Sequence, residues 1–365
     1  MNRNTAPRLA IAAALGTVLG TSVPAMAQLE EVIVTAQKRE QGLLDVPISV
    51  ATLSGERFAS MFEGGADIRA LSARVPGLYA ESSNGRVAPR FYIRGLGNID
   101  FDLAASQPVS IIMDEVVKEN VVLKSFPLFD IARVEVLRGP QGSLFGRNTT
   151  AGIIKFDSNK PTQDFEGRAK LDVGELGTVN FEGAVGGGLT ENVSGRIALM
   201  VQNRDDYIDN GYTGENDALG GFEENAAKAF LQWDATDNLS FLLGAHYRDL
   251  DGTSATFRAN IFDTGSNKLN ENYDRETVWF DGGDNNPQEY ESNGLNLKID
   301  WGLGDVTLTS ITAWDEADGF SRGDIDGGFG AVFALPMGPG FIPFPSDTPV
   351  SYTHLRAHET SDDIS

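Results

Sequence analysis

Short runs of alternating apolar and polar residues dominate the chain after Pro161 and constrain its fold more than any other feature. Ala169, Leu171 and Val173 alternate with polar residues, and the pattern returns in RIALMVQNRD, KAFLQWD, LSFLLGAHYRD, LNLKIDW and DVTLTSITAW. A period of two residues gives each face of a strand its own set of side chains. The pattern therefore predicts antiparallel strands with one apolar face, in a half-buried sheet or a membrane barrel.

The connections between these strands differ in length in a regular way. We expect strands at residues 166–175, 178–187, 193–204, 225–235, 238–250, 289–302 and 305–316. The connections after the second, fourth and sixth strands are tight, whereas residues 205–224 and 251–288 form long polar loops. Only the connection after the first strand, ELGT, breaks the pattern, because it is short at the long-loop end. Short turns at one end and long loops at the other are typical of an outer-membrane barrel.

Aromatic residues lie near both ends of the expected strands. Trp233 and Trp301 precede short turns, and Tyr207, Tyr247 and Trp314 lie near the opposite ends. Membrane barrels carry aromatic girdles at both interfaces, so this placement also favours a barrel. A soluble β-sandwich with tryptophans in its core is the alternative.

The first residues resemble an export signal. Arg3 and Arg8 precede an apolar run, and Ala25-Met26-Ala27 follows it. This order is typical of a cleaved signal peptide, with an ordinary N-terminal helix as the alternative. No later apolar stretch approaches the roughly 18 residues that a spanning helix needs. If the protein enters a membrane, we expect it to do so as strands.

Composition narrows the possible functions. The net charge of −23 argues against nucleic acid as a partner, because the phosphate backbone would be repelled. The absence of cysteine excludes a disulfide framework and a thiolate nucleophile. The acidic segments 205–224 and 315–326 lack the spacing of an EF-hand and read as solvated loops. We find no catalytic arrangement and expect neither an enzyme, a cofactor nor a metal site.

Between Val46 and Asp157 the pattern is that of a compact α+β domain. Strands are expected in VPISVATL and FYIRG and at residues 109–114, 133–138 and 152–156. Ser54 and Asp67 are candidate N-caps of two short helices. Asn84 and Gly85 predict a hairpin turn.

Two glycine-rich segments suggest nucleotide binding but do not meet its requirements. The loop in VEVLRGPQGSLFGRNTTAGIIKF, Val134–Phe156, has no GxxxxGK[ST] and no helix pattern directly after it. RGLGNID has Asp100 where a dinucleotide fingerprint needs its third glycine. We therefore expect turns at both places.

EEVIVTAQ after a signal peptide, then VPISV, IRG and the segment Val134–Phe156, together resemble a TonB-dependent outer-membrane receptor of the siderophore-receptor type. The resemblance implies an α+β plug domain followed by an antiparallel transmembrane β-barrel of about 22 strands in the cell outer membrane. It also implies import of ferric siderophores energised by the TonB protein, with outer-membrane lipid around the barrel. Import of oligosaccharide, cobalamin or another scarce nutrient is the alternative.

The resemblance assigns roles to particular residues. The TonB box, which a partner protein grips by β-strand addition, would be Glu31, Val32, Ile33, Val34, Thr35 and Ala36. We expect this segment to have no strand partner inside the chain; a frayed tail is the alternative. Arg94 and Arg138 match plug arginines that pair with barrel glutamates, or are simply solvated. The turn formed by Ser82, Ser83, Asn84 and Arg86 either contacts ligand or is only a turn.

These observations give an expected organisation. It comprises a signal peptide (1–27), a TonB box and linker (28–45), a plug domain (46–157), a partial barrel (158–350) and a non-native tail (351–365). Seven or eight strands cannot enclose the plug, so we expect a fragment truncated within the barrel. The tail shows no strand alternation.

Two other functional classes remain open at this point. One is a receptor that also signals through an extra periplasmic domain. The other is a secreted acidic enzyme or carbohydrate-binding β-protein.

Overall fold

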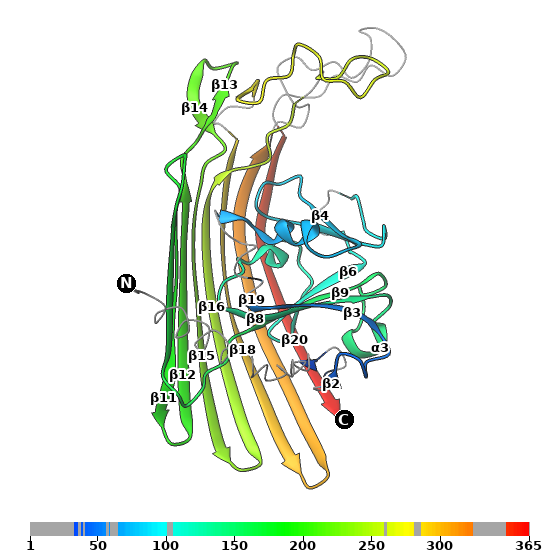
Figure 1. Ribbon diagram of the computed structural model, residues 1–365, viewed down its shortest axis with the longest axis vertical. Coiled ribbons are helices and arrows are strands. Elements are labelled where there is room, and N and C mark those ends of the chain that lie inside the picture. The colour runs from blue at the N-terminus through cyan, green and yellow to red at the C-terminus, as the bar shows by residue number, and fades with distance from the viewer. Residues whose placement is uncertain are drawn as a thin grey trace, which may run out of the picture.

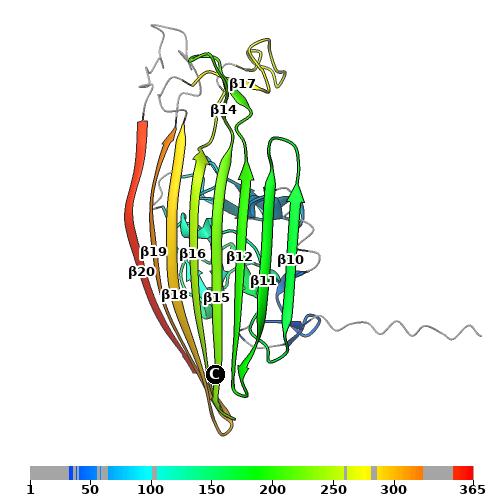
Figure 2. The same cartoon turned by 90° about the vertical axis from the view of Figure 1, so that its left-hand side faces the viewer.

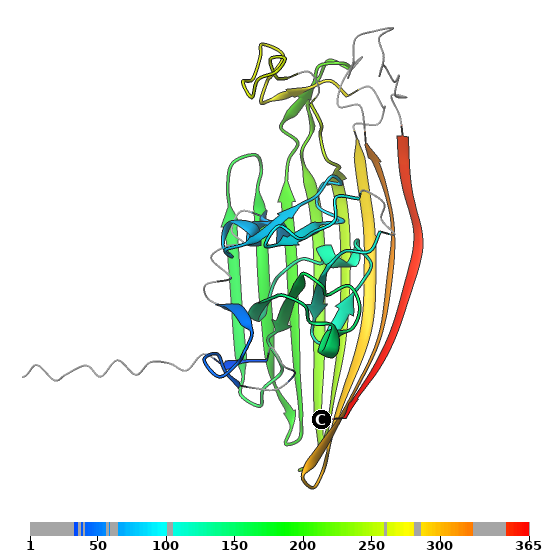
Figure 3. The same cartoon turned by 90° about the vertical axis from the view of Figure 1, so that its right-hand side faces the viewer.

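The computed structural model describes residues 33–35, 38, 41–55, 58, 65–100, 105–258, 261–280, 286–323 and 348–364. The expected signal peptide lies outside these residues, as do Glu31, Val32 and Ala36 of the TonB box and most of the helix expected after Ser54. A tall curved sheet, which we call the wall, holds a smaller domain against its concave face (Figures 1 and 3).

The wall is a single antiparallel sheet of eight of the described strands (Figure 2). In spatial order the strands are β10 (Glu166–Val173), β11 (Val179–Thr190), β12 (Val193–Arg204), β15 (Phe222–Thr236), β16 (Leu239–Thr253), β18 (Pro287–Leu303), β19 (Val306–Gly323) and β20 (Thr348–Ile364). The seven strands that the alternation predicted are confirmed, and the largest shift is the end of β19, at Gly323 rather than residue 316.

Strand β20 was not expected. It pairs antiparallel with β19 along most of its length, so the expectation of a tail without strand structure is wrong for residues 351–364. An edge strand offers unpaired backbone N–H and C=O groups, which can pair with an extended segment whatever its side chains. Sequence alternation is therefore not needed there. The non-native origin of residues 351–365 stays a prediction.

The two faces of the wall differ in what covers them. The plug packs on the inner face, whereas Trp233 and Trp301 on the outer face are about 45% exposed. Trp233 stacks on Phe241 with ring centroids 5.2 Å apart. The alternative of a sandwich with tryptophans in its core is therefore wrong. None of the described helices is long and apolar enough to cross a membrane.

The plug, which we define as residues 46–157, is built on a mixed five-stranded sheet. Its strands, in spatial order, are β3 (Ser49–Ser54), β8 (Ile131–Arg138), β9 (Gly152–Ser158), β6 (Val109–Met113) and β7 (Val116–Lys118). β6 and β9 run parallel and the other pairs antiparallel. A separate hairpin pairs β4 (Leu78–Glu81) with β5 (Arg90–Ile93) around the predicted turn at Asn84 and Gly85.

Three short helical segments complete the described part of the plug: η2 (Ile68–Ala73), η3 (Leu123–Ser125) and α3 (Gly142–Phe145). Asp67 caps η2 as predicted, since its carboxylate accepts a hydrogen bond from the Arg69 amide at 2.9 Å. The helix is of the 3-10 type and ends shortly before Pro76.

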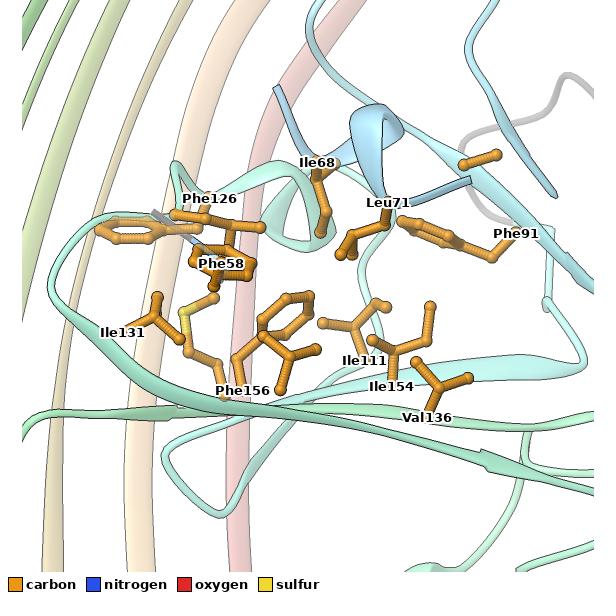
Figure 4. Close-up of a cluster of buried hydrophobic side chains, with 14 of the residues drawn as sticks. Phe58, Ile68, Leu71, Phe91, Ile111, Phe126, Ile131, Val136, Ile154 and Phe156 are labelled. Atoms are coloured by element: carbon orange, nitrogen blue, oxygen red, sulfur yellow. The ribbon is translucent and has the colours of Figure 1, made fainter. Parts of the chain in front are cut away.

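The plug core lies between the sheet and η2. Aromatic and branched side chains from all parts of the plug meet there: Phe58, Ile68, Leu71, Phe91, Ile111, Phe126, Ile131, Val136, Ile154 and Phe156 (Figure 4). Ala184, Ala198, Met200 and Ala226 of the wall belong to the same cluster. Plug and wall therefore share one hydrophobic core.

Two long loops form a small sheet beyond one end of the wall (Figure 1). It contains β13 (Ile208–Asn210), β14 (Glu215–Leu219) and β17 (Thr277–Val278), with Ile208, Leu219 and Val278 as its core. This small sheet distinguishes the long-loop end of the wall from its short-turn end.

At the N-terminal side, β1 (Ile33–Val34) pairs with β2 (Gln41–Gly42).

Candidate functional site: the N-terminal strand and the plug–wall interface

The described part of the predicted TonB box is docked on the plug. Ile33 pairs with Gly42 and Val34 with Gln41. The Val34 side chain is fully buried in a cluster with Leu137, Phe145 and other apolar residues. The expectation that this segment has no strand partner inside the chain is therefore wrong, because β2 pairs with it. β2 has only two residues, which is too short for its sequence to show a strand pattern.

Thr35 connects the same segment to a group of buried charges. Its amide donates to Glu135 Oε1 at 2.8 Å, and its hydroxyl accepts from Lys155 Nζ at 2.6 Å and from Arg133 at 3.2 Å. Burial raises the pKa of Glu135, an effect that the hydrogen bond from Thr35 and the charges of Arg133 and Lys155 only partly offset. Withdrawal of Thr35 would remove one of the few donors to a fully buried carboxylate.

Buried ion pairs at three places join the plug to the inner face of the wall in the described part of the chain. The first lies toward the long-loop end and centres on Glu224 of β15, which is 1% exposed. Arg86 of the plug donates to one carboxylate oxygen from Nη2 and Nε at 2.7 and 2.9 Å. Arg248 of β16 donates to the other at 2.7 and 2.8 Å, and also to Ser125 of the plug at 2.8 Å. One buried carboxylate therefore serves two guanidinium groups.

The second contact joins β7 to β19. Lys118 Nζ lies 2.6 and 2.8 Å from the two carboxylate oxygens of Asp315, and both side chains are 4% exposed. His246 Nε2 approaches the same carboxylate at 3.0 Å. The His246 ring meets Phe126 of the plug edge to face at 5.0 Å. Plug and wall each donate to this one acid from a side-chain nitrogen.

The third contact lies nearer the short-turn end. Arg196 of β12 binds both oxygens of Asp130 at 2.7 Å, and Asn159 donates to the same carboxylate at 2.8 Å. Burial would raise the pKa of Asp130, but these hydrogen bonds outweigh it and hold the pKa below its ordinary value. Nearby, Lys228 of β15 donates to the Phe129 carbonyl at 3.1 Å and to Ser158 at 3.2 Å.

Arg94 and Arg138, the arginines assigned to plug–barrel contact, bond within the plug in the described part of the chain. Both donate to the Ser49 hydroxyl, at 3.2 and 3.4 Å, and Arg138 also donates to the Pro76 carbonyl at 3.1 Å. Their pairing with barrel glutamates stays a prediction. The buried ion pairs that join the plug to the described wall come from Arg86, Lys118 and Asp130 instead. A more exposed pair, 3.9 Å long, joins Glu115 of the plug to Lys298 of β18.

The turn assigned to ligand contact is packed against the wall. Ser82 and Ser83 bond inside the plug, to the Val87 carbonyl and to Arg90 at 2.6 Å each. Asn84 accepts hydrogen bonds from wall residues, among them Gln288 at 2.6 Å and Ser254 at 3.1 Å. With Arg86 held by Glu224, two of the four residues serve the interface. Direct contact with a ligand stays a prediction for all four.

Sequence analysis missed the wall partners in these contacts. Glu224 was assigned to the polar loop 205–224, but it belongs to β15 and is in phase with the inward-facing Ala226 and Lys228. The available signal was that Glu224 is in phase with Ala226 and Lys228 in a segment that alternates as a strand. Among the described residues, no group of three or more acids or histidines could hold a metal ion.

Comparisons with known proteins agree with this architecture. Residues 42–153 match the family model described as the TonB-dependent receptor plug domain. The ferrioxamine B receptor of Salmonella typhimurium is 27% identical over 253 residues, which are 66% of this chain and 34% of that receptor. The ferripyoverdine receptor of Pseudomonas aeruginosa is 30% identical over 152 residues, 40% of this chain and 17% of the receptor. The chain thus spans about a third or less of the relatives it matches.

The fold has a counterpart among solved structures. The crystal structure of the ferripyoverdine receptor of the outer membrane of Pseudomonas aeruginosa, bound to ferripyoverdine, matches with a TM-score of 0.68 at 18% identity. The match covers 90% of this chain and 41% of that one. At this identity the likeness concerns the fold alone. It confirms the expected class, an α+β plug followed by antiparallel barrel strands.

Proposed function

We propose that this chain, a TonB-dependent receptor of the outer membrane by its plug domain and barrel strands, belongs to an importer of ferric siderophore complexes. The proposal rests on the position of the plug against the inner face of the wall. Buried ion pairs at three places hold the plug against the wall, so a path for a ligand between plug and wall requires some of these contacts to shift.

The curated relatives support the ligand class. Two of the similar curated proteins are receptors for ferrioxamine B and ferripyoverdine, both of which carry iron in a chelate. Receptors bind and release a ligand without chemical change, which fits the expected absence of enzymatic activity. We take a ferric chelate as the transported ligand.

The N-terminal strand supplies the proposed link to the energy source. β-strand addition relies on backbone N–H and C=O groups, and Ile33–Val34 already pairs in this way with β2. A partner that forms a longer ladder with the segment would replace this two-residue pairing. We propose that TonB binds at this strand and exerts a mechanical force on it. The force would pass through Thr35 to the buried charges around Glu135.

The test uses the full-length protein in a bacterial strain without its own siderophore receptors. Radiolabelled ferric ferrioxamine B and ferripyoverdine serve as probes, and surface binding is measured separately from iron accumulated inside the cell. We expect at least one probe to bind and to accumulate. The proposal fails if neither chelate binds.

A matched pair of variants tests the energy link. Val34→Pro removes a backbone donor and should abolish accumulation while it leaves surface binding unchanged. Val34→Ala keeps the donor and should retain most of the accumulation. Accumulation that survives Val34→Pro and also survives deletion of residues 31–36 would refute the role of this segment.

A further inference from the structure

A groove of about 520 Å³ opens on the outer face of the wall, the side away from the plug. It crosses β11, β12, β15 and β16. Its floor consists of small residues that are neighbours across strands, Gly187 beside Gly195 and Ala229 beside Ala245. The volume lies within the roughly 300–1,000 Å³ of small-molecule sites. The surface is concave here because the glycines and alanines of the floor have small side chains or none.

The borders of the groove are apolar and accessible. Leu189 is 66% exposed and Ile197 is 54% exposed, and Phe165 extends from the segment before β10 across Gly187. The charged side chain of Arg196 turns inward to Asp130, so this part of the border is backbone. A ligand in the groove would meet mainly hydrocarbon.

The groove lies just inside the aromatic girdle of the short-turn end. Leu231 and Leu243 on its border are two residues from Trp233 and Phe241, the stacked pair on the outer face. Two residues of a strand span about 7 Å. Girdle residues lie at the level of the lipid headgroups, so the groove lies at the depth of the adjoining acyl chains.

We propose that this groove binds one acyl chain of a phospholipid from the membrane leaflet at the short-turn end. The groove is continuous with the apolar outer surface that a barrel presents to lipid, which favours a lipid chain over a protein partner. The inference rests on the outer-membrane location and is independent of the transported ligand. Loss of siderophore uptake would therefore leave it untouched.

Native mass spectrometry of the full-length protein, extracted from outer membranes with mild detergent, tests the proposal. We expect the wild-type protein to retain one phospholipid. Ala229→Leu fills the floor and should lower the retained fraction at least fivefold. Ala227→Leu makes the same change two residues away on the outer face of the same strand and should retain the lipid, since Ala227 does not line the groove. Equal retention by both variants would overturn the proposal.

A second measurement needs no substitution. Phospholipids with a photoreactive group in the acyl chain are incorporated with the wild-type protein, and the labelled peptides are identified. We expect labels to concentrate on residues 185–197 and 229–245. Labels spread evenly over all outward-facing strands would overturn the proposal.

Discussion

The Glu224 carboxylate of the wall and the Arg86 guanidinium of the plug lie 2.7 Å apart, with side chains 2% and 12% exposed. Arg86 also stacks over the Phe222 ring, 3.8 Å from its centroid, and donates to Gln202 and to the Gly65 carbonyl at 3.0 and 2.8 Å. One arginine therefore ties the tip of the β4–β5 hairpin to two wall strands and to a second part of the plug.

The first prediction concerns this carboxylate. Glu224→Ala leaves Arg86 and Arg248 buried without their acid, and the loss of one partner from a buried pair costs about 3–5 kcal/mol. We expect faster hydrogen exchange in residues 82–90 and a lower urea midpoint for loss of plug structure. Glu223→Ala removes the neighbouring exposed acid and should change stability by less than about 0.5 kcal/mol. Equal effects of the two changes would contradict the role of Glu224.

The second prediction concerns Lys118 and Asp315. Each single change, Lys118→Met or Asp315→Leu, leaves a buried charge without its main partner and should cost about 3–5 kcal/mol. The double variant removes both charges and should cost clearly less than the two single costs added together. Urea unfolding of the four proteins completes the cycle. Additive costs would mean that the 2.6 Å contact contributes nothing of its own.

The third prediction concerns pH and Asp130. Because its pKa is held below the ordinary 3.8, the stability that it gives is present above that value and is lost as the pH falls through the folded-state pKa. Asp130→Asn should therefore be less stable than wild type from pH 5 to 8, with a gap that narrows below pH 3.8. Asp164→Asn, at an exposed carboxylate, is the control. A gap that persists undiminished at pH 2 would contradict the assignment.

The fourth prediction concerns the docked N-terminal strand. Val34→Asp places a charge in a fully buried apolar cluster, whereas Ile33→Asp makes the same change at a side chain that is 46% exposed. We expect rapid protease cleavage and fast hydrogen exchange around residues 33–35 only in Val34→Asp. Both variants offer the same backbone to a partner. If the two are cleaved at the same rate, the strand is not held by Val34.

The sequence was sufficient to predict elements whose patterns are local. The period of two in the wall predicted seven strands, and Asp67 before Ile68, Leu71 and Val75 predicted a capped helix, because alternation and capping depend on neighbouring residues. The hairpin at Asn84 follows from the same kind of local chemistry.

The contacts between plug and wall could not be predicted in this way. Arg86 and Glu224 are 138 residues apart, and Lys118 and Asp315 are 197 apart, so no local pattern relates them. The two acids directly after Phe222, Glu223 and Glu224, also concealed where β15 begins, so Glu224 was placed in a loop. The docking of Val34 depends on β2, whose two residues carry no strand pattern.

The central claim is that the plug must shift against the wall for a ferric chelate to pass. The 365 residues of this chain contain no cysteine, so an introduced pair meets no competing thiol among them. Asn84→Cys with Ser321→Cys would replace the hydrogen-bonded pair that joins the plug turn to β19, and mass spectrometry would confirm the disulfide. The most direct measurement is iron accumulation by cells that carry this variant of the full-length protein, before and after reduction. We predict surface binding without accumulation while the disulfide is intact and recovery of accumulation after reduction. Undiminished accumulation with the disulfide fully formed would contradict the account.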